Sequence, residues 1–363
     1  MKILIASSYH HAWNSVRPEA EMFIEMVNQG HKVTVATQGD AEYVKRFRDQ
    51  GVKVIDCYPS GKICCKTIRT LHKELKGGDY DVCYAFNSKT IPNAAFACIG
   101  TKAKLITYRG TTGGLYRHDP SAYLTHLHPR VDGIVCVSEA VRQDVIKRVW
   151  KKPDQIKTIY KGHQLDWYLV PPTSREEFGL NDKHIIGICA AHVRPSKGIS
   201  ILAQATHYIN NPDFHLILVG SGYEPHLEEI KNSPMAERIH LVGHRKDVPS
   251  IMAMADFQIQ PSISGEGLPR TIIEAMANGT TSVVTTTGGS PELVDDGKTG
   301  YIVQTGDAKA LAEAMNKLIN DREKIAEFSQ AAKHKLNTEF NAQQTVKKHL
   351  AFFESLQAGN CQQ

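Results

Sequence analysis

A glycine-bearing loop that carries two carboxylates leads into a predicted helix over residues 261–276. Pro269 suits the first turn of a helix, so the free N–H groups and the positive dipole end at this point are placed to bind an anion such as a pyrophosphate. Glu266 lies in the loop, whereas Glu274 lies about one and a half turns into the helix, where it can accept hydrogen bonds from ribose hydroxyls. The other ligand-binding candidates here are Gly267, Leu268, Pro269 and Arg270. The alternative is an ordinary surface loop with a solvated Glu266.

Three further segments combine small residues with charge. Arg194 and Lys197 follow a predicted strand, and two cations three residues apart at a strand end can clamp a diphosphate. Glycines in the other two segments let the backbone approach a ligand closely. One pair follows a strand, and the other lies in a turn that leads into a helix with Ser290 as its predicted cap. These glycines are Gly220, Gly222, Gly288 and Gly289.

Short apolar runs alternate with helical patterns in both halves of the chain, which predicts two α/β domains built on doubly wound parallel sheets. The predicted strands are residues 2–6, 32–36, 52–57, 80–85, 105–108 and 133–137, and then 185–190, 215–219, 239–242, 257–260 and 282–285. With the polar stretch 170–174 as the linker, we predict an N-terminal domain over residues 1–168 and a C-terminal domain over residues 169–340. A final helix over about 341–363 is expected to pack back on the first domain. Ligands of such sheets bind at the carboxyl ends of the strands, so we expect a cleft between the domains.

Composition and charge exclude several classes of protein. No apolar run approaches the roughly 20 residues of a membrane span, and the run at residues 3–6 is too short for a signal peptide, so we expect a cytoplasmic protein. The net charge is +5, and residues 1–165 hold 25 Lys and Arg against 15 Asp and Glu. The first domain is therefore expected to face something anionic. Because the excess is moderate and no nucleic-acid-binding module accompanies it, nucleic acid is not an expected partner.

The order of the four segments resembles the donor domain of the retaining GT-B-fold glycosyltransferases of family four, the group 1 glycosyl transferases. Glu266 and Glu274, separated by seven residues, and the later turn over residues 287–292 carry the resemblance. It covers the second half of the chain strongly and the first half loosely. It implies two facing Rossmann-like domains and retaining transfer of a hexosyl unit from a UDP-, GDP- or ADP-sugar, without a metal ion. It also suggests bacterial surface polysaccharide or lipopolysaccharide synthesis, on a glycan or glycolipid acceptor.

The resemblance further implies roles for individual residues. Glu266 would contact the transferring sugar and Glu274 the nucleotide ribose, while Arg194 and Lys197 would neutralise the leaving diphosphate. Many relatives have an arginine where this chain has His192, so the assignment of Lys197 is the firmer one. Two other functions stay open on the same fold, namely a sugar-nucleotide epimerase and a non-catalytic binding partner.

The acceptor side follows the family less closely. Relatives often carry a histidine in the loop after the fifth strand, where this chain has Arg109. His118 is a nearby substitute for that histidine, and the alternative for it is a solvated loop residue. The acceptor-side candidates are Arg109, Gly110, His118 and His10.

Residues with metal-binding chemistry do not form a convincing site. Asp79 and Asp81 match the DxD string of metal-dependent glycosyltransferases, but they lie in the other half of the chain from the donor segments, so we interpret them as a turn. The cysteines and histidines show no metal spacing and predict no disulfide framework. His126 and His128 alternate in a polar loop, and we expect both to be solvated.

Residues 62–76 have the pattern of an amphipathic helix. Its predicted apolar face consists of Cys64, Ile68, Leu71 and Leu75, and its basic face of Lys62, Lys66, Arg69, Lys73 and Lys76. Such a face can dock on anionic lipid headgroups at about 1 kcal/mol per cation, which would make the protein peripheral on the inner face of the membrane. The alternative is a solvated helix face.

Overall fold

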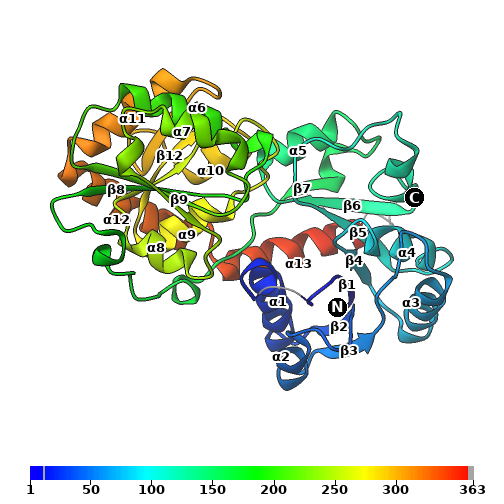
Figure 1. The fold of residues 1–363 in the computed structure, drawn as a ribbon. Coiled ribbons are helices and arrows are strands. Elements are labelled where there is room, and N and C mark those ends of the chain that lie inside the picture. Colours follow the sequence, from blue (N-terminus) through cyan, green and yellow to red (C-terminus); the bar gives the residue numbers. More distant parts are fainter. Residues whose placement is uncertain (11–12, 359–363) are drawn as a thin grey trace. The chain divides into compact units, whose positions relative to one another are not determined.

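The computed structural model describes residues 1–10 and 13–358. The chain forms two compact units, one made of Met1–His163 with Phe340–Gln363 and the other of Gln164–Glu339. Each unit is built on one parallel sheet with helices packed against it (Figure 1). The predicted fold class, two α/β domains with parallel sheets, is therefore confirmed.

The sheet of the first unit has seven strands in the order β3-β2-β1-β4-β5-β6-β7, and all neighbours are parallel. The strands are β1 (Lys2–Ala6), β2 (Lys32–Thr37), β3 (Lys53–Asp56), β4 (Val82–Ala85), β5 (Lys104–Arg109), β6 (Val131–Cys136) and β7 (Ile156–Thr158). β4 is buried along its whole length, as expected for a central strand covered on both faces. The strand order reverses between β1 and β4, so a ligand-binding crevice is expected at their carboxyl ends.

The helices of the first unit include one from the end of the chain. They are α1 (Trp13–Asn28), α2 (Val44–Asp49), α3 (Cys65–Gly78), α4 (Thr90–Ala97), α5 (Glu139–Ile146) and α13 (Ala342–Ala358). Ser138 caps α5, because its Oγ accepts a hydrogen bond from the Val141 N–H. The helix α13 packs beside α1 (Figure 1), and its His349 lies 3.3 Å from the Tyr84 hydroxyl of β4. The predicted final helix extends to residue 363, but residues 359–363 lie outside the described part of the chain.

The sheet of the second unit has six parallel strands in the order β10-β9-β8-β11-β12-β13. The strands are β8 (Ile185–Ala190), β9 (Phe214–Val219), β10 (Ile239–Gly243), β11 (Phe257–Gln260), β12 (Thr281–Thr285) and β13 (Gly300–Val303). The helices are α6 (Ile199–Ala205), α7 (Leu227–Lys231), α8 (Val248–Met254), α9 (Arg270–Asn278), α10 (Ser290–Leu293), α11 (Ala308–Ile319) and α12 (Arg322–Glu339). The order reverses between β8 and β11, so the loops that follow these two strands are the expected ligand-binding loops.

The structure differs from the sequence-based predictions at the start of α3 and at two strands, and it explains the DxD string. The amphipathic helix begins at Cys65 and not at residue 62, because Cys64 is its extended N-cap and Lys62 lies in the preceding loop. Asp79 is the C-cap of α3 with a φ of 55°, and Asp81 accepts a hydrogen bond from the Lys2 N–H. The DxD string is thus a helix-to-strand turn. β7 and β13 were not among the predicted strands.

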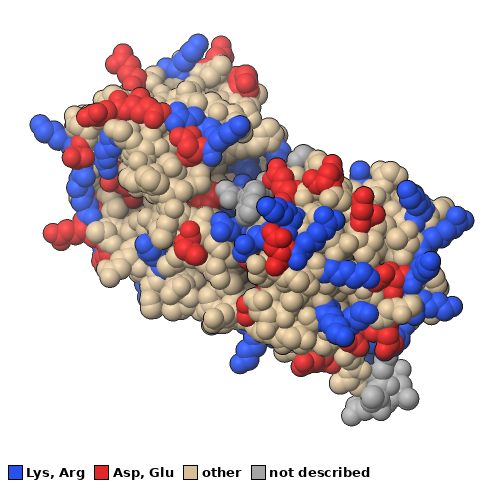
Figure 2. Space-filling view, turned by 90° about the horizontal axis from the view of Figure 1, so that it is seen from below, with Lys and Arg blue, Asp and Glu red and all other residues tan. Residues whose placement is uncertain are grey.

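Surface charge and hydropathy limit the interactions that the fold offers. Figure 2 shows Lys and Arg interspersed with Asp and Glu on the face that it presents, without one continuous basic surface. Over residues 1–10 and 13–358, none of the helices combines the length and the apolar character that a membrane span requires.

Candidate functional site

The four segments singled out in the second half of the sequence meet at the carboxyl ends of β8, β9, β11 and β12. Gly198 has a φ of 66°, and a Cβ added to it would lie 2.0 Å from the Pro261 carbonyl oxygen. Gly288 has a φ of 56°, and a Cβ added there would lie 2.0 Å from the Glu266 carbonyl oxygen. Only glycine fits at such positions, so the backbone brings the loops after β8 and β12 against the loop after β11.

The turn after β9 also packs tightly, in this case against the segment after β8. A Cβ on Gly220, whose φ is 130°, would lie 1.8 Å from the Ala191 carbonyl oxygen. Gly222 has a looser but still tight contact, with 3.0 Å between an added Cβ and the Val193 carbonyl oxygen. The two predicted glycines therefore seat this turn against the segment after β8 that ends at Lys197.

Lys197 and Glu266 form a close ion pair within this loop cluster. The Lys197 Nζ lies 2.6 Å from Glu266 Oε1, and Glu266 is only 7% exposed. The same carboxylate oxygen accepts hydrogen bonds from Ser262 Oγ at 2.6 Å and from Gln260 Nε2 at 3.0 Å. Three donors thus hold one buried oxygen, which offsets the cost of taking its charge out of water.

The partners of Glu266 are themselves fixed by neighbouring elements. Thr271 Oγ1 donates to Gln260 Oε1 at 2.9 Å, while Thr285 Oγ1 and Thr287 Oγ1 donate to the Ser262 carbonyl oxygen at 2.5 and 2.8 Å. Sequence reasoning missed Gln260 and Ser262. The signal that could have found them is the glutamine pair in the buried strand β11, because a buried amide needs hydrogen-bond partners.

Glu274 lies on α9 and is 4% exposed. Arg270 Nε lies 3.1 Å from Glu274 Oε1, one helical turn earlier on the same face. Burial raises the pKa of the Glu274 carboxyl, and the Arg270 charge opposes that rise. Pro269 is the N-cap of α9 and not part of its first turn, because its ψ of 119° is extended. The preceding Gly267 is buried, so the loop packs closely before the helix begins.

Arg194 and His192, two other predicted residues of this loop cluster, lie at its exposed edge. Arg194 is exposed and is the N-cap of the 3-10 turn Pro195–Lys197, whereas Lys197 contacts the buried carboxylate. His192 is also exposed, and its Nδ1 lies 3.0 Å from Ser221 Oγ. The structure also corrects the predicted cap of α10, because Gly289 is the N-cap and Ser290 is the first helical residue.

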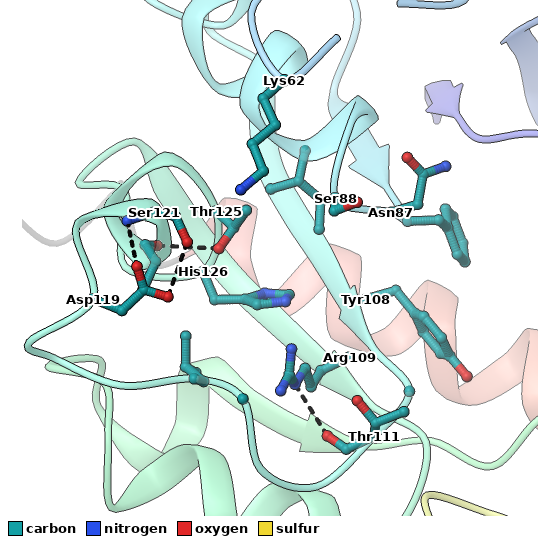
Figure 3. Close-up of a pocket in the computed structure, with 16 residues that line it drawn as sticks. Lys62, Asn87, Ser88, Tyr108, Arg109, Thr111, Asp119, Ser121, Thr125 and His126 are labelled. Carbon is teal, nitrogen blue, oxygen red and sulfur yellow. Dashed lines mark hydrogen bonds between the residues drawn. The ribbon is translucent and has the colours of Figure 1, made fainter. Parts of the chain in front are cut away.

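The first unit contains a cavity of about 270 Å³ at the carboxyl ends of β4 and β5. Its lining includes Gly110 and the polar residues Lys62, Asn87, Ser88, Tyr108, Arg109, Thr111, Asp119, Ser121, Thr125 and His126. Figure 3 shows Lys62 reaching from one side toward the space next to His126 and Arg109. The predicted acceptor-side residues Arg109 and Gly110 therefore belong to this cavity.

His126 is a residue of this cavity that sequence reasoning placed wrongly. His126 is 4% exposed and His128 is 8% exposed, so the expectation that both are solvated is wrong. His126 Nδ1 lies 2.9 Å from the buried Thr107 Oγ1. Burial, together with the Arg109 charge, lowers the pKa of His126 to about 3. The imidazole is therefore neutral at physiological pH.

Arg109 is anchored to the loop that follows it. Its Nε donates to the Thr111 carbonyl oxygen at 3.0 Å, and its Nη2 donates to the Gly113 carbonyl oxygen. Burial lowers the pKa of Arg109, and the charge of Asp144 opposes that shift. Because a guanidinium remains protonated even so, Arg109 brings a fixed positive charge to the cavity.

The other two acceptor-side candidates lie outside the lining of this cavity. His118 is exposed and stacks on Tyr116, with 5.3 Å between the ring centroids and 19° between the planes. His10 lies after β1, with its Nδ1 3.7 Å from Asp40 Oδ1. Within residues 1–10 and 13–358, no group of three or more His, Cys, Asp or Glu side chains is arranged to hold a metal ion.

Two family models match successive parts of this chain. The model described as glycosyl transferases group 1 matches residues 170–335, and the model described as glycosyltransferase family 4 matches residues 20–167. Together they span most of both units.

Similar proteins include bacterial glycosyltransferases and a solved structure with UDP bound. A GDP-mannose-dependent alpha-(1-6)-phosphatidylinositol monomannoside mannosyltransferase of Mycolicibacterium smegmatis is 25% identical, and the match covers 92% of each chain. A lipopolysaccharide core biosynthesis mannosyltransferase of Rhizobium meliloti is 30% identical, and the match covers 51% of this chain and 57% of the relative. The structure of Anabaena HepE in complex with UDP superposes with a TM-score of 0.77 and 21% identity, over 98% of this chain and 100% of that one.

Proposed function

The chain belongs to the group 1 glycosyltransferases of the GT-B fold, and we propose that it transfers a sugar from a nucleoside diphosphate sugar to an acceptor hydroxyl with retention. The observation that carries the proposal is the ion pair, 2.6 Å long, between Lys197 of the loop after β8 and the buried Glu266 of the loop that leads to α9. A cation, a carboxylate and a helix N-terminus at the reversal of strand order suit a ligand that is both anionic and hydroxylated. A UDP-, GDP- or ADP-sugar has this chemistry.

In the proposed complex, the cations take the diphosphate and the carboxylates take the hydroxyl groups. Lys197 and Arg194 neutralise the phosphates, with the N–H groups at the start of α9 and the glycine turns of the cluster as further donors. Glu266 accepts hydrogen bonds from the transferring sugar, and Glu274 accepts them from the ribose. Arg270, 3.1 Å from Glu274, orients that carboxylate.

The proposed reaction forms one bond and breaks one bond at the anomeric carbon. The acceptor oxygen bonds to that carbon on the face from which the diphosphate leaves, and the diphosphate takes the electron pair of the broken C–O bond. The acceptor proton passes to an oxygen of the departing phosphate, so no protein base is required. Lys197 lowers the barrier because its charge interacts more strongly with the diphosphate as negative charge develops there.

The cavity of the first unit is the proposed acceptor site. Arg109 supplies a fixed charge, and the neutral His126 and the hydroxyls of Ser121 and Thr125 supply hydrogen-bonding groups suited to a glycan. We place the reaction in bacterial surface polysaccharide or lipopolysaccharide synthesis, with a glycan or glycolipid acceptor. The names of the bacterial relatives support this setting.

We also propose that the first unit docks peripherally on the cytoplasmic face of a membrane through residues 62–76. The apolar part of this surface differs from the predicted helix face, because Leu71 and Leu75 are buried. Ile63 and Ile99 take their place, at 55% and 53% exposed. They line an apolar surface cavity to which the cationic residues Arg69 and Lys73 also contribute, together with Ile68, His72 and Phe96. Apolar groups beside cations match an anionic lipid surface.

The first experiment identifies the donor. The melting temperature is measured with UDP, GDP and ADP and with their sugars, because a ligand that binds the folded state raises it by mass action. One nucleotide series should raise the melting temperature, and that donor is then incubated with and without bacterial glycan acceptors. NMR of the new anomeric linkage reads the stereochemistry. An inverted product contradicts the proposed mechanism.

The same incubations separate the two rival functions. A sugar-nucleotide epimerase would convert the donor when no acceptor is present, whereas a glycosyltransferase needs the acceptor to form its product. A non-catalytic binding partner would convert the donor in neither case. The chain carries Lys197, Glu266 and Glu274 together, which argues against the non-catalytic binding partner.

A further inference from the structure

An exposed group of aromatic side chains lies on the first unit, outside the cavity described above. Tyr116, Tyr123 and Trp150 are 42%, 37% and 62% exposed. The Tyr123 and Trp150 rings adjoin each other, with 5.8 Å between their centroids. Tyr116 stacks on His118, so the exposed rings extend as far as that histidine. Large apolar side chains gathered on a surface in this way typically mark a binding site.

Two arginines hold these rings in place. The Arg117 guanidinium carbon lies 5.1 Å from the centroid of the Trp150 ring, and Arg117 Nε donates to the Arg148 carbonyl oxygen at 2.8 Å. Arg148 lies over the Tyr116 ring at 4.8 Å, and its Nη1 donates to the Leu115 carbonyl oxygen at 3.1 Å. The Tyr123 hydroxyl donates to the Arg117 carbonyl oxygen at 3.0 Å. The rings are thus ordered in advance, which reduces the entropy lost when a ligand binds.

The segment that carries two of these rings, Tyr116 and Tyr123, also lines the cavity of the first unit. Leu115, Asp119 and Ser121 line the cavity, and Tyr116 and Tyr123 belong to the same short stretch of the chain. The Asp119 carboxylate is fixed by the Ser121 N–H at 2.8 Å and by the Ser121 hydroxyl at 2.9 Å. One short stretch of the chain therefore carries both hydrogen-bonding groups of the cavity and two of the exposed rings.

We propose that Tyr116, Tyr123 and Trp150 form a subsite for the distal sugars of a glycan acceptor whose terminal sugar occupies the cavity. A pyranose ring presents C–H groups on its face and hydroxyls at its edge, and the aromatic rings and the polar cavity match these two features. Sugar is favoured over anionic lipid as the occupant because both arginines are already engaged by rings and carbonyl oxygens. This inference rests on the proposed function, since it concerns the acceptor of that reaction.

Direct binding tests the subsite without requiring catalysis. Immobilised α-linked tetrasaccharides of mannose, glucose, galactose and N-acetylglucosamine, each beside its disaccharide, are presented to the full chain and to Trp150→Ala and Tyr123→Ala. At least one tetrasaccharide should bind, and each substitution should weaken that binding about tenfold. The matched control is Tyr208→Ala, which removes a tyrosine that is 51% exposed on the second unit and should bind like the original protein. Circular dichroism verifies that the variants are folded.

Catalysis supplies the second measurement. In Trp150→Ala, the ratio of KM for the tetrasaccharide to KM for its disaccharide should rise about tenfold. Glycan binding that is unchanged in Trp150→Ala and Tyr123→Ala overturns the subsite, as does the absence of binding to every tetrasaccharide. Loss of binding only to vesicles of phosphatidylcholine and phosphatidylglycerol in equal parts overturns it in favour of a lipid contact. A chain that binds glycans through Trp150 but transfers no sugar refutes the proposed function and leaves the subsite standing.

Discussion

At the scale of single residues, the ion pair between Lys197 and Glu266, which is 7% exposed, determines the expected effect of replacing the lysine. Glu266 keeps Ser262 and Gln260 as donors in Lys197→Ala, so we expect the variant to fold. Turnover should fall about a hundredfold, because the missing cation acts most strongly as charge develops on the leaving diphosphate. Steady-state kinetics beside circular dichroism measures both effects. The control is Lys231→Ala, an exposed lysine of the same unit, and near-normal turnover in Lys197→Ala would refute the phosphate-clamp role.

The two glutamates of the site should respond differently to the same change. Glu266→Gln should lower turnover more than nucleotide affinity, because in the proposed complex this carboxylate contacts the transferring sugar and not the nucleotide. Glu274→Gln should lower nucleotide affinity first, because its carboxylate lies on α9 beside Arg270. Calorimetric titration with the nucleoside diphosphate alone separates the two effects. Equal losses of affinity in both variants would contradict this division of roles.

At the scale of elements, α3 and the loop before it carry the proposed membrane contact. Reversal of the exposed Lys66, Arg69 and Lys73 to glutamate should abolish sedimentation with vesicles that contain anionic lipid, since six units of charge are changed at the contact. Binding by the original protein should weaken as salt rises, because screening shortens the range of these attractions. Activity on a short soluble acceptor reports whether the variant is folded.

A charge-matched control belongs to this experiment. Lys231, Lys246 and Lys309 are exposed on the second unit, and their reversal to glutamate changes the net charge by the same amount. Retained vesicle binding in the α3 variant, or equal loss in both, would leave the helix as a solvated surface.

Element boundaries show why some parts of the fold could be predicted and others could not. The buried strands Lys2–Ala6 and Ile185–Ala190 have the predicted bounds, because an uninterrupted apolar run is enough to identify a central strand. The strands Ile156–Thr158 and Gly300–Val303 are short and lie at sheet edges, so only pairing with a neighbour reveals them. The start of α3 depends on the extended conformation of Cys64, which helical periodicity does not encode.

At the scale of the whole molecule, the predicted site residues differ in how far local sequence could locate them. The segments around Lys197, Glu266 and Gly288 could be found because glycines and strand ends mark ligand-binding loops in any parallel sheet. The burial of His126 could not be found, because it depends on a cavity built from several segments of the first unit. The sequence around a loop histidine does not show whether its side chain is buried, because burial depends on tertiary packing.

Buried histidines make the first unit sensitive to acid. His126 and His163 have pKa values lowered to about 3, and His349 to about 4, chiefly because burial disfavours the charged imidazole. All three belong to the first unit. The unfolded chain binds these protons near pH 6.5 and the folded chain does not, so the free energy of unfolding falls as the pH drops below about 6.5. The loss continues until the pH reaches the lowered pKa values.

The effect can be assigned to one residue. Burial is the main reason why the pKa of His349 is low. The 2.9 Å contact with the Thr345 carbonyl oxygen favours the charged imidazole and opposes this shift, whereas the nearby Lys161 charge adds to it. The shift of His349 corresponds to roughly 2 kcal/mol of stability lost between neutral pH and about pH 5.

Scanning calorimetry of the original protein should show the melting temperature of the first unit falling on acidification. His349→Gln should lower the melting temperature at neutral pH but reduce its dependence on pH. A pH dependence identical to that of the original protein would show that His349 is not the residue responsible.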